Sequence, residues 1–244
     1  MTAIKIKGLR KEYKDVVAVE GLDLEIGEGE LFSLLGVNGA GKTTTVKMLS
    51  GLTVPTAGDA EICGFSVVKE PDRVKESIDV SMQETAIARK LAVEENIAFY
   101  AAMRGHGKEQ IEQDKKYVYS VFGLDSAAKR YAGKLSGGWQ RKLSVALALI
   151  SRPKVLFLDE PTLGLDVIAR RELWGTIREL KGKMTIILTT HYMEEAEALS
   201  DRIGVMKDGK LLFVGTKEEM YALTGKENVE EAFVSIVTGG ESNA

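Results

Sequence analysis

Apolar and polar positions along the chain follow two patterns that are typical of β-strands. Near the N-terminus, apolar residues alternate with polar ones around Ile4 and Ile6 and again over 22–26, as expected for strands with one buried face. Short, almost entirely apolar runs follow at 31–35, 155–158 and 185–188. Such runs are typical of strands that are buried on both faces of a parallel sheet. The sequence therefore predicts an α/β fold with a mostly parallel sheet and an N-terminal antiparallel β subdomain.

The spacing of apolar residues becomes helical between Val93 and Leu135. Gly105 and Gly107 separate two predicted helices, and His106 between them is expected in an exposed loop. We therefore predict a helical subdomain inserted into the α/β core. The predicted parts of a single domain over 1–244 are the β subdomain and core at 1–83 and 136–216, the helical subdomain at 84–135 and a C-terminal helical tail at 217–244.

Four finer features are also predicted. Alternation predicts a strand through Ala60, Ile62 and Gly64, with Cys63 on its opposite face, and another strand at 78–82. A helix is expected from Trp139 to Ile150, stopped by the following proline. Residues 239–244 are expected to be frayed.

One glycine-rich segment lies where the strand at 31–35 leads into a helix. Glycines allow the backbone N–H groups of such a turn to point inward at phosphates, and the helix N-terminus adds a favourable dipole. Lys42 offers a compact positive charge to β- and γ-phosphates, and the Thr43 hydroxyl can ligate Mg²⁺. The predicted nucleotide-binding residues of this P-loop are Gly36, Asn38, Gly39, Ala40, Gly41, Lys42, Thr43 and Thr44.

Two other interpretations of this segment are possible. A glycine-rich turn without a ligand does not require lysine and threonine at these offsets. A dinucleotide-binding turn fits less well, because its third glycine would fall on Thr44. The phosphate-binding P-loop is the interpretation that the flanking strand and helix favour.

Polar residues also follow the ends of other predicted strands. Gln83, Asp159, Glu160 and His191 all fall at such ends, and ligands of open α/β sheets bind beyond the carboxyl ends of strands. Asp159 is suited to Mg²⁺, directly or through water, and Glu160 could polarise an attacking water. A bare pair of acids is more often a solvated turn, but the preceding apolar strand and the P-loop favour a site.

Composition narrows the protein class. The formal net charge of −3 gives no indication of nucleic-acid binding. The longest apolar run, Ile97 to Met103, is far shorter than the roughly 18 residues of a membrane span, and the N-terminus lacks the apolar core of a signal peptide. Cys63 is the only cysteine, which favours a reducing compartment. These features predict a soluble cytoplasmic protein whose membrane link comes through a partner.

Together the motifs resemble the ATP-binding subunit of an ABC transporter, over essentially the whole chain. Residues 36–44 match the Walker A motif, and 155–160 match Walker B. Leu135-Ser136-Gly137-Gly138 matches the signature loop, and Leu163-Gly164-Leu165-Asp166 resembles the D-loop. Gln83 takes the Q-loop position, His191 the switch position and Tyr13 the adenine-stacking position. The resemblance implies a P-loop NTPase core.

The resemblance also implies a mechanism and partners. In this family two subunits, identical or closely related, clasp two ATP molecules, each between Walker A of one chain and the signature loop of the other. Ser136, Gly137 and Gly138 would then meet the γ-phosphate of the opposite site. Glu160 would act as general base, His191 would hold the γ-phosphate, and Mg²⁺ would be held by Thr43, Gln83 and Asp159. A separate integral membrane permease would place the protein on the cytoplasmic side of the cell membrane.

The chain departs from the family pattern in the signature. Trp139 stands where glutamine is usual, which affects the ribose-side contact. Its side chain could cover the nucleotide of the opposite subunit or pack inside the helical subdomain. The segment 131–134 lacks the acidic coupling motif of exporters with fused domains, and 228–233 resembles type-2 exporters of drugs, ions or polysaccharides.

Two other functional classes are less consistent with the sequence. Chromosome and repair members of the superfamily carry a long coiled coil between Walker A and the signature, whereas the gap here has only short helices without sustained heptads. Translation-type members carry two ATPase domains in one chain. GTPase switches and small-molecule kinases have no use for a signature loop, and the base-reading motif Asn-Lys-x-Asp is absent. Transport is the favoured function.

Overall fold

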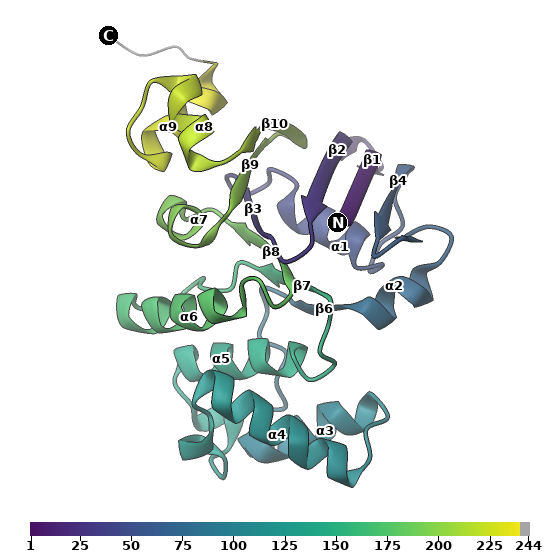
Figure 1. Ribbon diagram of the computed structural model, residues 1–244, viewed down its shortest axis with the longest axis vertical. Helices are drawn as coiled ribbons and strands as arrows, with labels where there is room; N and C mark the ends of the chain where they lie inside the picture. The colour runs from purple at the N-terminus through teal and green to yellow at the C-terminus, as the bar shows by residue number, and fades with distance from the viewer. Residues whose placement is uncertain (240–244) are drawn as a thin grey trace.

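The computed structural model describes residues 1–239 (Figure 1). Two sheets lie side by side, a group of helices extends from one end of them and a helical tail from the other. Of the stretch 239–244 that was predicted to fray, residues 240–244 lie outside the described part of the chain. Gly239 is described, and it ends the last helix in a left-handed backbone conformation.

A six-stranded sheet has the strand order β10-β9-β3-β8-β7-β6. All neighbouring strands are parallel except β9 and β10, which form a hairpin. The three strands β3, β7 and β8 are buried over their whole length, as their apolar sequences predict. The strand predicted at 78–82 ends one residue early. The bounds are β3 Leu31–Leu35, β6 Ile78–Ser81, β7 Val155–Asp159, β8 Thr185–Thr190, β9 Arg202–Lys207 and β10 Lys210–Gly215.

A four-stranded antiparallel sheet is built from the N-terminal part of the chain, in the order β2-β1-β4-β5. The strand predicted to run to Gly64 ends at Ile62, because Cys63 and Gly64 take positive φ values of 52° and 85° and turn the chain into β5. Cys63 therefore lies in a turn, half-buried against the core, and not on a strand face. The bounds are β1 Thr2–Tyr13, β2 Val16–Gly27, β4 Ala57–Ile62 and β5 Phe65–Ser66.

Helix α1 (Lys42–Leu49) packs in the core that joins the two sheets, and α2 (Pro71–Ser77) flanks it. The side chains of β7 pack alternately into two different hydrophobic cores. Val155 and Phe157 enter the core shared with α1, and Leu156 and Leu158 enter the core shared with α5 and α6. Strand β7 is therefore covered on both faces, which fixes the position of the acids at its end.

The helices at the lower end of Figure 1 are α3 (Val93–Met103), α4 (Lys108–Phe122) and α5 (Gly137–Ala148). Short 3₁₀ turns at 125–127 and 132–134 connect α4 to α5. The predicted apolar faces of α3 and α4 are buried in the core shared with α5. The predicted start of α5 at Trp139 was two residues late, because the Ser136 hydroxyl accepts a hydrogen bond from the Trp139 N–H and caps the helix one residue before Gly137.

His106 differs from its predicted state as a simple exposed loop residue. It does lie between α3 and α4, but its Nδ1 is 2.6 Å from the Asp114 carboxylate, which is fully buried. Gln110 also donates to that carboxylate. The loop is therefore attached to α4 by polar contacts that its sequence does not reveal.

The remaining helices cover the larger sheet and the tail. Helices α6 (Val167–Leu180) and α7 (Met193–Leu199) follow β7 and β8, and α8 (Lys217–Thr224) and α9 (Val229–Thr238) form the tail that was predicted at 217–244. Met220 and Phe233 of the tail pack on Val205 of β9 in a third core. The division of the chain at 83–84 and 135–136 remains a prediction, since α5 packs both on α3 and α4 and on the sheet side.

Candidate functional site

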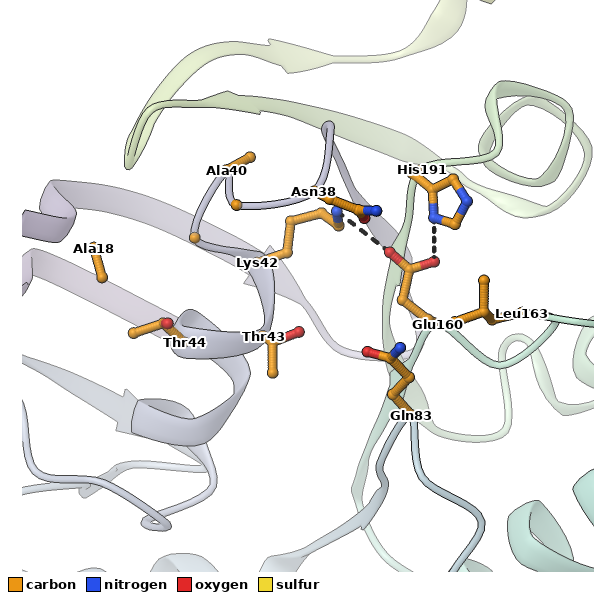
Figure 2. Close-up of a pocket in the computed structure, with 12 residues that line it drawn as sticks. Ala18, Asn38, Ala40, Lys42, Thr43, Thr44, Gln83, Glu160, Leu163 and His191 are labelled. Carbon is orange, nitrogen blue, oxygen red and sulfur yellow. Dashed lines mark hydrogen bonds and ion pairs between the residues drawn. The ribbon is translucent and has the colours of Figure 1, made fainter.

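A pocket of about 370 Å³ lies at the carboxyl ends of the parallel strands (Figure 2). Segments far apart in the sequence meet there: the loop after β3, the end of β6, the loop after β7 and the loop after β8. The structure thus brings together most of the predicted site. The lining residues are Ala18, Asn38, Gly39, Ala40, Gly41, Lys42, Thr43, Thr44, Gln83, Glu160, Leu163 and His191.

Two glycines of the loop after β3 are required by close approaches. A Cβ added at Gly36 would lie 2.4 Å from the Met206 carbonyl oxygen, and one at Gly41 would lie 2.4 Å from the Ala18 carbonyl oxygen. Gly41 also has φ 103° at the N-terminus of α1, a conformation that side chains disfavour. The loop can therefore curl against β2 and β9 only with glycine at both positions.

Lys42 is held at the centre of the pocket. Its ammonium is nearly buried and donates hydrogen bonds to the carbonyl oxygens of Gly36, at 2.7 Å, and Val37, at 3.2 Å. The ammonium also lies 3.3 Å from Glu160 Oε1. Figure 2 shows Lys42, Glu160 and His191 in one line of contacts. A positive charge is thus fixed beside the N-terminus of α1, where anions are stabilised.

Glu160 has an unusual backbone for a residue that is not glycine, with φ 48°. Strain of this kind costs roughly 1–3 kcal/mol and persists only where neighbours hold the chain. Here the Glu160 N–H donates to both the backbone oxygen and the hydroxyl of Thr189, each at 3.1 Å. Its Oε2 lies 2.8 Å from His191 Nδ1. The turn therefore aims a nearly buried carboxylate into the pocket, in contact with a histidine.

Asp159, at the end of β7, has the chemistry of a magnesium ligand. Its Oδ1 accepts hydrogen bonds from the hydroxyls of Thr43, at 3.0 Å, and Thr189. Its Oδ2 is buried and has no hydrogen-bond partner within residues 1–239. No group of three or more His, Cys, Asp or Glu side chains that could hold a metal occurs in the same range. Mg²⁺ bound with nucleotide does not require one, because phosphate oxygens and water complete its shell.

Arg141 is a residue of the site that the sequence analysis missed. It lies on α5 and is almost fully buried, with its guanidinium spread over backbone carbonyl oxygens of two loops. It donates to Met82 at 2.6 Å and Gln83 at 3.2 Å, and to Asp159 at 2.9 Å and Pro161 at 2.7 Å. Burial lowers the pKa of Arg141 to about 10, against the charges of nearby carboxylates. An arginine on the apolar face of the helix after the signature loop was the signal available in the sequence.

Some predicted residues lie outside the pocket. Tyr13 is at the end of β1, 45% exposed, with the Lys11 ammonium 4.8 Å from its ring centre. Gly36 contributes its carbonyl to Lys42 but does not line the pocket. The signature residues Ser136, Gly137 and Gly138 begin α5 and do not line it either. Ala18 and Leu163 line the pocket although the sequence analysis did not select them.

The strand, glycine-rich loop and helix with Lys-Thr, together with acids at the end of a neighbouring parallel strand, define a P-loop NTPase. A sequence model for the family described as "ABC transporter" matches residues 19–163. The daunorubicin resistance ATP-binding protein DrrA3 of Streptomyces coeruleorubidus is 39% identical over 230 residues, which are 94% of this chain and 73% of that protein. This chain therefore belongs to the ABC transporter family, as an ATP-binding and ATP-hydrolysing domain.

A larger protein and a solved structure are also similar to this chain. The human phospholipid-transporting ATPase ABCA3 is 41% identical over 220 residues, 88% of this chain but only 13% of that protein. The structure of cbiO1 from Clostridium perfringens, described as part of the ABC transporter complex cbiONQ, aligns with a TM-score of 0.83 and 27% identity over 91% of each chain. These relatives give no support to a non-transport ATPase.

Within the described part of the chain, no helix is long and apolar enough to cross a membrane.

Proposed function

We propose that this chain is the ATPase subunit of an exporter, dimerises around two molecules of ATP with Mg²⁺, and drives export through a separate membrane subunit. The observation that carries the proposal is the pocket in which Lys42, Glu160 and His191 meet at the N-terminus of α1. The similar proteins named for phospholipid transport and daunorubicin resistance support an apolar or amphipathic substrate.

The pocket residues divide the chemistry of hydrolysis between them. Lys42 and the N–H groups of the loop before α1 would bind the phosphates. Glu160 would take a proton from the water whose oxygen attacks the γ-phosphorus, while the bond to the bridging oxygen breaks and ADP leaves. His191 would keep the Glu160 carboxylate aimed at that water through their 2.8 Å contact and would reach the γ-phosphate from its other ring nitrogen.

The donor set at Asp159 fits Mg²⁺. Thr43, Asp159 and Gln83 would hold the ion, which neutralises charge on the β- and γ-phosphates when bound. The unpartnered Oδ2 of Asp159 and the neighbouring Thr43 hydroxyl offer the hard oxygen ligands that this ion prefers.

A second subunit would complete the site. Ser136 and the glycines after it begin α5 away from this chain's own pocket, with N–H groups at a helix N-terminus. Such a terminus is suited to a phosphate, and in a head-to-tail pair it would face the nucleotide of the partner subunit. The proposed dimer is either a homodimer or a pair of close paralogues.

The helical subdomain offers a surface for a membrane subunit. Segments 89–93 and 128–133 run side by side, with the Ala132 N–H donating to Leu91 at 2.9 Å and the Gly133 N–H to Arg89 at 2.9 Å. The exposed cationic side chains of these segments form a basic ribbon. None of these side chains makes an ion pair with an acidic side chain within residues 1–239. The basic ribbon consists of Arg89, Lys90, Lys129 and Arg130 of these two segments, together with Lys134, the residue directly after the second segment. It lies between Gln83 and the signature loop in sequence, so a partner bound there would contact segments that lead to both.

The catalytic proposal is tested with Glu160→Gln. The amide keeps the size of the side chain but removes the base, so hydrolysis should fall by roughly 10²–10⁴ while ATP still binds. Size-exclusion chromatography with Mg²⁺ and ATP should then show a dimer. Glu84→Gln, at an exposed acid of the loop after β6, is the matched control and should hydrolyse ATP at the parent rate. Parent-rate turnover by a monomeric Glu160→Gln variant would contradict the proposal.

The docking proposal is tested by charge reversal within the basic ribbon. Lys90 is an exposed member of the ribbon, and Lys69 is an exposed lysine in the loop before α2, outside the ribbon. Lys90→Glu should reduce the amount of protein that sediments with membranes of the source cells and leave basal ATPase activity unchanged. Lys69→Glu is the matched control and should change neither. Membrane binding by the Lys90 variant at the parent level would contradict the docking assignment.

A further inference from the structure

A buried carboxylate lies directly behind the turn that carries Glu160. Glu195 is the third residue of α7, and its side chain is completely inaccessible to solvent. Its Oε1 accepts two hydrogen bonds, from the Thr162 hydroxyl at 2.9 Å and from the Trp174 indole N–H at 2.9 Å. Its Oε2 has no hydrogen-bond partner in the part of the chain that the structure describes. An acid in this state is rare, because burial of an unpaired carboxylate is strongly unfavourable.

The two donors come from segments that also serve the pocket. Thr162 lies two residues after Glu160, in the turn that leads from β7 to the loop 163–166. Trp174 lies on α6, the helix that begins directly after that loop. Glu195 itself lies about one helical turn after His191 in the sequence, on helix α7, which follows β8. The Oε1 atom of Glu195 therefore links three segments, namely the turn after Glu160, helix α6 and helix α7.

The turn at Glu160 needs such an anchor. Its left-handed backbone is strained, and strain of this kind persists only where contacts on both sides hold the chain. Thr189 holds the N–H of Glu160, and Arg141 holds the carbonyl oxygens of Asp159 and Pro161. The hydrogen bond from the Thr162 hydroxyl to Glu195 holds the next residue of the turn, directly after Pro161.

We infer that Glu195 is a positioning residue for hydrolysis: it fixes the strained turn so that Glu160 and His191 stay aligned, and it transmits the position of the loop 163–166 to that pair through Trp174. The inference rests on the proposed role of Glu160 as the base. Burial also raises the pKa of Glu195, while Thr190, Trp174 and Thr162 oppose the rise. The carboxylic acid and the carboxylate can both accept the two bonds at Oε1.

The test compares two substitutions of Glu195 in the full chain. Glu195→Gln keeps an oxygen acceptor in place and should retain kcat within about twofold. Glu195→Ala removes the acceptor and should lower kcat by roughly ten- to a hundredfold, the usual effect of a displaced catalytic group. KM for ATP should stay within about twofold, because the hydrogen-bond partners of Glu195 within residues 1–239 are Thr162 and Trp174, and neither belongs to the phosphate-binding loop at 36–44.

Leu199→Ala separates positioning from simple stability. Leu199 is buried on the same helix, but it has no polar role, so its truncation should lower the thermal midpoint and leave kcat unchanged at a temperature well below that midpoint. If Glu195→Ala behaves like Leu199→Ala, with a lower midpoint and an unchanged kcat, the positioning role is wrong. Thr162→Val removes only one donor with little change in shape, so it tests the same contact if the Glu195→Ala variant does not fold; a parent-like kcat would overturn the inference.

Glu160→Gln in the same assay distinguishes failure of the inference from failure of the proposed function. An inactive Glu160→Gln variant together with a fully active Glu195→Ala variant refutes the positioning role alone. A fully active Glu160→Gln variant refutes the proposed base. A spectroscopic signature completes the test: in a Trp139→Phe background, Trp174 is the remaining tryptophan, and its emission should shift when Glu195→Ala removes the acceptor of its N–H. An unchanged emission would show that this bond is absent in solution.

Discussion

Replacement of Arg141 by alanine tests whether the signature helix is locked to both loops beneath the pocket. The side chain is 4% exposed and makes hydrogen bonds of 2.6–3.2 Å to carbonyl oxygens of Met82, Gln83, Asp159 and Pro161. Alanine removes every one of these donors and leaves a cavity. The loops after β6 and β7 would then lose the group that ties them to α5.

The magnitude follows from the chemistry of these bonds. A hydrogen bond to a charged group contributes roughly 1.5–3 kcal/mol, and a buried carbonyl left without a donor costs roughly 1–3 kcal/mol. The cost of burying the guanidinium, which also lowers the pKa of Arg141 to about 10, offsets part of the gain. We expect a net loss of about 3–5 kcal/mol of unfolding free energy, because several carbonyl oxygens lose their donor at roughly 1–3 kcal/mol each while removal of the buried charge offsets part of the loss. For a chain of this size, the thermal midpoint should fall by roughly 6–20 °C.

Urea unfolding and ATPase assays measure the two consequences. Lys142→Ala is the matched control, because Lys142 is the next residue and pairs with the exposed Glu172 at 2.6 Å, an interaction worth at most about 1 kcal/mol. The Arg141→Ala variant should unfold at a clearly lower urea concentration and hydrolyse ATP more slowly at saturating ATP. Equal midpoints for the Arg141 and Lys142 variants would refute the assigned contribution of the buried guanidinium.

Three further predictions concern single residues. Lys42→Ala should weaken ATP binding by roughly ten- to a hundredfold through loss of its charged hydrogen bonds, and calorimetry that finds parent affinity would remove the P-loop assignment. Because the Trp139 ring is half-buried against the helical core, Trp139→Gln should lower the thermal midpoint by a few degrees, about 1 kcal/mol; an unchanged midpoint with a shifted KM for ATP would instead support contact with the partner's nucleotide. Burial raises the pKa of Glu195 above its ordinary 4.5, the charge of Glu160 adds to the rise, and hydrogen bonding from Thr190, Trp174 and Thr162 opposes it, so ionisation destabilises the fold as pH rises through and beyond that value. The stability of Glu195→Gln relative to the parent should therefore increase between pH 4.5 and pH 7.5 in urea unfolding, and a constant difference would contradict the raised pKa.

Local patterns were sufficient to predict the elements that bear the site. The apolar runs at 31–35, 155–158 and 185–188 form β3, β7 and β8, because short, continuous apolar runs are typical of strands that are buried on both faces of a parallel sheet. Lys42 and Thr43 follow glycines that the backbone demands, so their position at the start of α1 could be predicted from the spacing. The pocket confirms the proximity of Gln83, Glu160 and His191 that the strand ends implied.

Other features depend on tertiary contacts that no local pattern encodes. Arg141 and Glu195 are charged residues on helices, and charged residues are normally expected on the solvent side. Their burial depends on carbonyl groups and donors from segments that are 18 or more positions away. The positive φ of Cys63, which moves it off the strand, is likewise decided by the turn into β5 and not by alternation. Tyr13, at the end of β1, does not line the pocket, whereas the neighbouring strand β2 contributes Ala18.

The strand order of the larger sheet has a consequence for synthesis on the ribosome. Strand β3 is made first of the six, yet its neighbours on either side are β8 and β9, which begin at Thr185 and Arg202. At roughly 5–20 residues per second, the apolar strand with its attached P-loop waits on the order of ten to thirty seconds for a partner. During that time its unpaired edges are exposed to other nascent chains. We therefore expect slow, late folding of the nucleotide site and a dependence of soluble yield on chaperones that cover β3 until β8 emerges.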